Sequence, residues 1–164
     1  MAELTNLESK LSEVIGLAMA AQGATEKVMQ LPELERELEQ KLTRMREEAK
    51  QTEQRATDVA SSFVEKKDAI LDEAKDVRQK ATEMMKDYLD RAADALDGFE
   101  FLTMAEAGEV GHWEILGTLN QRARNAQIKE LVEWAIPIQR RHFDEVREGS
   151  LKLAAGEDPN ESSS

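Results

Sequence analysis

The sequence predicts an all-α protein, folded as an antiparallel four-helix bundle with a long helical crossover segment at residues 64–97. Its 164 residues include only three prolines and eight glycines, which leaves few places for the chain to turn. Ala, Leu, Glu, Lys, Arg and Gln dominate, and these residues favour helix. Apolar residues also recur at alternating spacings of three and four, as on one face of a helix. We expect one helical domain at residues 1–155 and a polar, disordered tail at residues 156–164.

Charge and composition exclude several classes of protein. The chain has 34 Asp and Glu against 22 Lys and Arg, a formal net charge of −12, which argues against a nucleic-acid partner. The absence of cysteine excludes disulfide scaffolds, iron–sulfur clusters and thiol nucleophiles. The first ten residues do not resemble a signal peptide, and no apolar run approaches the ~20 residues that cross a bilayer. These features predict a cytoplasmic protein without a membrane span.

A first helix is predicted over residues 4–30. Its end is expected at Leu31, because the residue before a proline is pushed out of the helical region. Its apolar positions form one stripe, made of Leu4, Leu7, Leu11, Val14, Ala18, Ala21 and Val28.

Residues 33–97 contain neither glycine nor proline. As one helix, this segment would be ~98 Å long, too long for a compact domain of this size. The apolar stripe also slips by one residue near Ser61 and Ser62, so we predict a break between Ala60 and Lys67. The alternative is a continuous helix in an antiparallel rod. The stripe before the break is Leu38, Leu42, Met45, Ala49, Thr52, Ala56, Val59 and Phe63, and the stripe after it is Ile70, Ala74, Val77, Ala81, Met84, Tyr88 and Ala95.

Two further helices are predicted over residues 98–124 and 126–153, with Asn125 as the N-cap between them. Five of the seven aromatic residues lie in this C-terminal hairpin, so we expect the best-packed core there. Gly108, Gly111 and Gly117 are interpreted as small residues that let helices approach closely.

The hairpin also carries candidate metal ligands. Glu109 and His112 are three residues apart and therefore lie on the same side of a helix, where both can reach one ion. They interrupt an otherwise apolar stripe, and burying a charge there is costly without a partner or a metal.

The second helix of the hairpin repeats this pattern. Gln139 precedes His142 by three residues, and Glu145 continues the same face. If the hairpin reverses direction at residues 124–125, His142 lies opposite the helical turn that contains Glu106 and Glu109. His112 then faces Pro137. The alternative interpretation is that both histidines are core residues satisfied by a neighbouring Glu or Gln.

On these residues the chain resembles the ferritin-like superfamily, and its C-terminal half is most similar to the YciF-type branch of bacterial stress-associated proteins. The resemblance is carried by residues 109–119, the segment EVGHWEILGTL. It implies a di-iron or di-manganese centre held by carboxylates, and a role linked to stress response. It also implies that Glu8 in the first helix and Glu48 in the second are ligands.

Three positions depart from the family pattern. Gly111 and Gln139 stand where the family has glutamate, and Met45 stands where it has histidine. The resemblance therefore implies a site that is altered or lost. The candidate ligands are Glu8, Glu48, Glu106, Glu109, His112, Gln139, His142 and Glu145.

Two other functions remain open at this level. The first is a metal-free helical scaffold for protein partners, a homodimer formed through the long charged helix. The second is a helix that binds lipid surfaces, which only the lysine- and alanine-rich residues 64–97 support.

Overall fold

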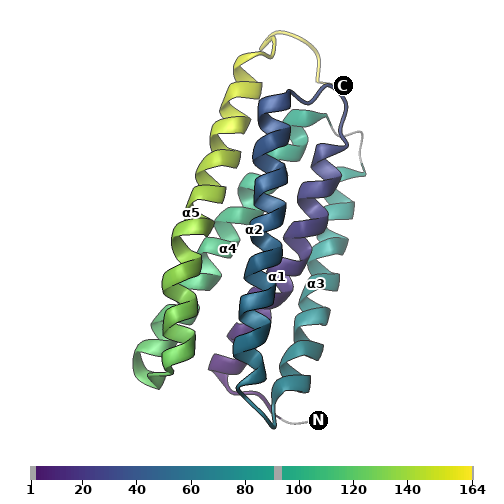
Figure 1. Cartoon of the computed structure of the whole chain (residues 1–164). Helices are drawn as coiled ribbons and strands as arrows, with labels where there is room; N and C mark the ends of the chain where they lie inside the picture. Colours follow the sequence, from purple (N-terminus) through teal and green to yellow (C-terminus); the bar gives the residue numbers. More distant parts are fainter. Residues whose placement is uncertain (1–2, 91–93, 164) are drawn as a thin grey trace.

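The computed structural model describes residues 3–90 and 94–163 and shows a bundle of five helices without strands in these ranges (Figure 1). The helices are α1 (Asn6–Met29), α2 (Arg36–Ser61), α3 (Lys67–Leu89), α4 (Ala95–Ala123) and α5 (Ala126–Ala155). The prediction of an all-helical bundle is therefore confirmed. Within the described ranges, no helix has an apolar stretch long enough to cross a membrane.

The helix ends follow local chemistry. Thr5 and Glu8 form a reciprocal capping box at the start of α1, and Asp94 and Asp97 form another at the start of α4. This second box starts α4 three residues before the predicted position. The side chain of Asn125 caps α5 by accepting a hydrogen bond from the Ile128 N–H, as predicted.

The predicted break is confirmed, because α2 ends at Ser61 and α3 begins at Lys67. The continuous rod is therefore wrong, and the long charged helix through which a dimer was predicted is divided in two. Helix α3 occupies most of the predicted crossover segment, of which residues 91–93 lie outside the described residues.

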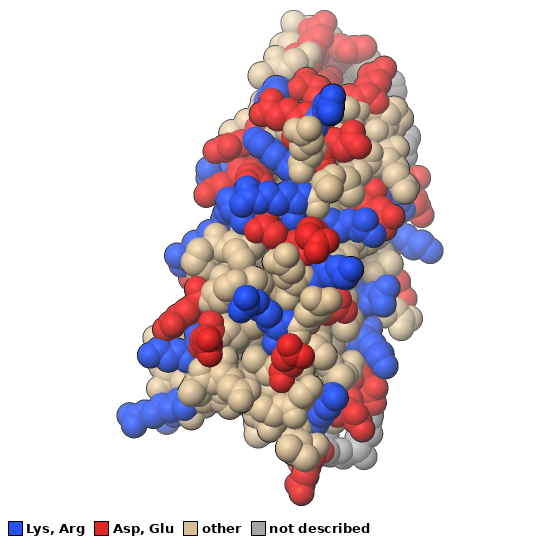
Figure 2. Space-filling view, in the orientation of Figure 1, with Lys and Arg blue, Asp and Glu red and all other residues tan. Residues whose placement is uncertain are grey.

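Four helices form a ring. Helix α1 packs on α2 and α4, and α5 packs on the same two helices from the other side; α3 lies mainly against α1. The charged residues of both signs are mixed over the surface seen in Figure 2, as expected for solvated helix faces.

The buried stripe of α2 matches the prediction from Leu38 to Ala56. The stripe of α3 does not, because Met85 and Leu89 are buried where Met84 and Tyr88 were expected. A straight helix has 3.6 residues per turn, so a strict three–four repeat drifts off the buried face after several turns.

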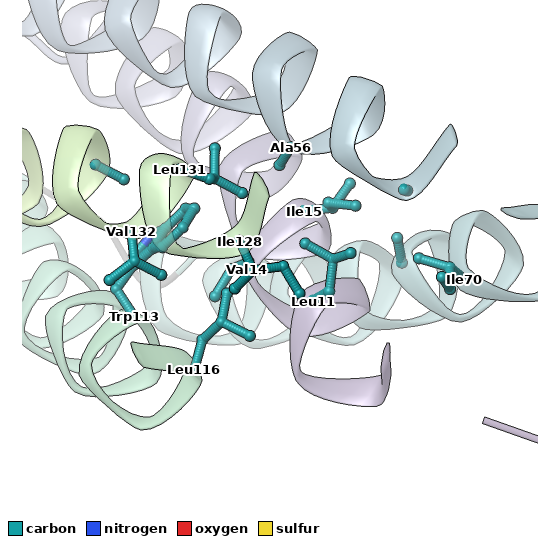
Figure 3. Close-up of a cluster of buried hydrophobic side chains, with 13 residues drawn as sticks. Leu11, Val14, Ile15, Ala56, Ile70, Trp113, Leu116, Ile128, Leu131 and Val132 are labelled. Carbon is teal, nitrogen blue, oxygen red and sulfur yellow. The ribbon is translucent and has the colours of Figure 1, made fainter. Parts of the chain in front are cut away.

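The core has two apolar clusters, one toward each end of the bundle. The first includes Leu11, Ile15, Trp113 and Leu116, with Ile128 and Leu131 from α5 (Figure 3). The second is formed by side chains that include Val28, Leu38, Leu42, Phe99, Leu102 and Val146. Between the two clusters, α4 and α5 bury polar residues: Glu106, Glu109, Gln139 and His142.

Candidate functional site

The buried polar layer is centred on His142, which is 1% exposed. Its Nε2 atom lies 3.2 Å from Oε1 of Glu48 on α2, and its Nδ1 atom lies 3.9 Å from Oε2 of Glu106 on α4. One imidazole thus lies between carboxyl groups of two other helices. The predicted proximity of His142 to Glu106 is confirmed.

Glu48 is the anionic side of this layer. Arg141 donates from both terminal nitrogens to its two carboxylate oxygens, with Nη1 3.0 Å from Oε1. Burial raises the pKa of Glu48, but the hydrogen bonds from Arg141 and His142 outweigh this effect, and the pKa lies below its ordinary value. Because ionised Glu48 can only accept a hydrogen bond, His142 donates to it from Nε2.

Burial lowers the pKa of His142, and the hydrogen bond to Glu48 opposes that shift only in part. The ring is therefore neutral at pH 7. With its proton on Nε2, the ring turns the lone pair of Nδ1 toward Glu106.

Glu106 and Glu109 have the opposite character. They are 2% and 4% exposed, and the Oε2 atom of each has no hydrogen-bond partner among the described residues. Burial raises the pKa of Glu106 to about 8. Burial, followed by the charge of Glu106, raises the pKa of Glu109 well above its ordinary value. Burial therefore favours the protonated form of both carboxyl groups.

Gln139 and Glu145 complete the layer on α5. Gln139 is 1% exposed and its Oε1 atom is unpartnered within the part of the chain that the structure describes. Glu145 Oε1 lies 3.6 Å from Nη1 of Arg141, whereas its Oε2 is buried without a partner in the same ranges. Several oxygen atoms in the layer are thus desolvated and unused.

Two of the predicted ligands lie elsewhere. Glu8 is at the first turn of α1, where it accepts from the Thr5 backbone N–H and lies 3.5 Å from Nζ of Lys66. His112 is half-buried, and its Nδ1 atom lies 3.2 Å from Glu13 and 3.3 Å from Lys10, both on α1.

The predicted position of His112 opposite Pro137 is therefore wrong, because the α4 face that packs on α5 includes Trp113. Trp113 is buried in the cluster that contains Ile128 and Leu131, whereas His112 turns toward Lys10 and Glu13 of α1. Helix α5 continues through Pro137 without interruption.

The role of Arg141 was missed from the sequence. Its spacing of four residues from Glu145 suggests an ion pair on the helix surface. Nothing in the sequence shows that Glu48, 93 positions away, is its main partner.

The arrangement does not bring a complete set of metal ligands together in its present form. Among the residues that the structure describes, no three or more His, Asp or Glu side chains are grouped so that they could hold a metal ion. In comparisons with known proteins, no family model, no curated protein and no solved structure matches the chain.

Proposed function

We propose that the chain is a ferritin-like protein with an altered site, which binds one transition-metal ion in the polar layer between α4 and α5. The observation that carries this proposal is the pair of buried carboxyl groups, Glu106 and Glu109, whose Oε2 atoms have no partner in the described ranges. An unpartnered buried polar group costs about 1–3 kcal/mol. A metal ion would satisfy both groups at once.

The ring of α1, α2, α4 and α5, with α3 as the segment between its two halves, supports the ferritin-like assignment. Helices α1 and α2 bury Ala18, Ala21, Met45 and Ala49, which offer no strong ligand. The carboxylate that α2 does bring to the layer, Glu48, is already paired with Arg141 and His142. For this reason we propose one ion rather than two.

The chemistry of the donors fits iron or manganese. Carboxylate oxygens, an amide oxygen and one imidazole nitrogen are ligands that these ions accept. In the structure these side chains are not yet grouped as a metal site. We therefore propose that Glu106, Glu109, Gln139 and Nδ1 of His142 draw together around the ion as its direct ligands. A histidine that binds a metal usually donates its other N–H to a carboxylate, and Glu48 occupies that position at 3.2 Å.

Each residue then has a defined task. Arg141 keeps Glu48 ionised, and Glu48 orients the imidazole so that Nδ1 faces the layer. Glu106 and Glu109 would release their protons when the ion binds, so that binding tightens as the pH rises. The ion would supply redox or oxygen chemistry, as the resemblance implies.

The test is the metal content of the untagged protein after anaerobic reconstitution with Fe(II) or Mn(II), measured by mass spectrometry. We expect one ion per chain. His142→Ala should abolish binding, whereas His112→Ala is the matched control because it removes the other histidine of the chain. Absence of metal from the wild type, or binding that depends on His112 and not on His142, would refute the site. The proposed link to stress response is a separate prediction.

A further inference from the structure

A cavity of about 280 Å³ lies between α1, α3 and α4, beside the polar layer. Its walls are mainly apolar and small, and an engineered cavity of ~150 Å³ with apolar walls is large enough to bind benzene. The side chains that form these walls include Leu17, Ala21, Ala24, Met85, Phe101 and Leu102.

Part of the wall is polar. Glu106 and Glu109 line the cavity as well as the polar layer. Both side chains are at least nine-tenths buried, and both Oε2 atoms lack a partner within the described residues. A ligand in the cavity would therefore meet apolar surface along its body and two acidic side chains at one end, where rotation of a carboxyl group would turn an unpartnered oxygen toward it.

The cavity opens next to exposed apolar side chains. Met84 and Met104 line it and are 64% and 54% exposed. Gly108 also lines it, and a Cβ atom at this position would meet no neighbouring atom within 4 Å. Close packing therefore does not explain Gly108, contrary to the prediction, although glycine inside a helix costs about 1 kcal/mol relative to alanine. Its small size leaves the entrance open.

We propose that this cavity binds a small apolar alcohol, such as a phenol, with its hydroxyl group directed to Glu106 and Glu109. A hydroxyl group both donates and accepts, so it can pair with a carboxyl group in either protonation state. The volume restricts the ligand to a single small molecule. This proposal does not depend on bound metal, and it is tested on metal-free protein.

The probes are 4-methylphenol and p-xylene, which differ only in that a methyl group replaces the hydroxyl group. In an apolar cavity without partners, the hydroxyl group would weaken binding about tenfold. We expect 4-methylphenol to bind at least as tightly as p-xylene in the presence of EDTA. Titration calorimetry gives the affinities. NMR of methyl-labelled methionine should show shifts at Met84, Met85 and Met104 and none at Met29, which does not line the cavity.

Gly108→Leu should fill the entrance and reduce the affinity for 4-methylphenol at least tenfold. Gly111→Leu is the matched control, because Gly111 lies three residues further along α4, has open space around its Cβ position and does not line the cavity. Leucine favours helix over glycine at both sites, so both variants should fold. The proposal would be overturned if 4-methylphenol bound tenfold more weakly than p-xylene. It would also be overturned if the two variants lost the same affinity for 4-methylphenol, or if the three methionines showed no shift. Failure of metal binding would leave it unaffected.

Discussion

At the scale of single residues, the polar layer contains two kinds of acid. Glu48 is compensated by the guanidinium of Arg141 and by the N–H of His142, and its pKa is lowered. Glu106 and Glu109 have no such compensation, and their pKa values are raised. The difference arises because α4 supplies its two acids to a region where no cation is hydrogen-bonded to them among the described residues.

These raised pKa values predict that metal-free protein loses stability as the pH rises. Between the two pKa values, the folded state retains protons on these acids that the unfolded chain releases. The stabilisation that comes from this proton binding is complete below about pH 4.5, and it is lost as the pH rises to the pKa of about 8 that Glu106 has in the folded state. Thermal unfolding in EDTA, followed by circular dichroism between pH 4 and pH 9, measures this decline. Because the lowered pKa values of Glu48 and His142 act in the opposite direction, the comparison that decides is with Glu109→Gln. The same pH dependence in the wild type and in that variant would contradict the burial of protonated carboxyl groups.

Glu109→Gln should remove part of this dependence. Near pH 7 the variant should be more stable than the wild type, because glutamine enters the core without first taking up a proton. At pH 4 the difference should disappear. Glu100→Gln is the control on the same helix, since Glu100 is exposed. The same variant should lose metal under the proposed function, so stability in EDTA and metal content should change in opposite directions.

At the scale of helices, the contact between α1 and α3 depends on Gly16. A Cβ atom there would lie 2.4 Å from the carbonyl oxygen of Ala74 and 2.7 Å from Cβ of Val77. Such contacts force the two backbones apart. The close approach of α3 to α1 therefore requires glycine at this position.

Gly16→Ala should accordingly lower the free energy of unfolding by about 2–3 kcal/mol. Gly23→Ala, on the same helix, should raise it by about 0.5–1 kcal/mol, because Gly23 has open space around its Cβ position and alanine favours helix. Urea unfolding of both variants measures the difference. Similar effects of the two substitutions would mean that α3 does not pack closely at Gly16.

At the scale of the whole molecule, the break between α2 and α3 determines the shape. The bundle is about as long as its longest helix, the 30 residues of α5, or roughly 45 Å. Small-angle X-ray scattering should give a maximum dimension well below the ~98 Å of an unbroken helix over residues 33–97. A maximum dimension of ~98 Å or more for a monomer would mean that α2 and α3 are continuous in solution.

Much of the fold could be predicted from the sequence, because helices and their ends depend on neighbouring residues. Proline at position 32, the cap at Asn125 and the phase slip near Ser61 all act locally. The stripes of apolar residues also follow from local spacing, as in α2. Small errors accumulate along a helix, so the predicted buried face of α3 is displaced by one residue. The capping box of Asp94 and Asp97 is a local signal that the prediction did not use.

Local patterns in the sequence predict the helical segments to within a few residues at their ends, with the break near Ser61 favoured over a continuous helix, and they point to residues 98–153 as the carriers of a buried acid and imidazole. The packing of the helices was needed to show that His142 meets Glu48 and Glu106, that Arg141 pairs with Glu48, and that His112 turns to α1 instead. The physical reason is geometric. A helix places neighbouring residues ~100° apart, so adjacent His112 and Trp113 face different helices. The rotation of α4 about its own axis decides which of the two faces α5, and packing along the whole helix sets that rotation.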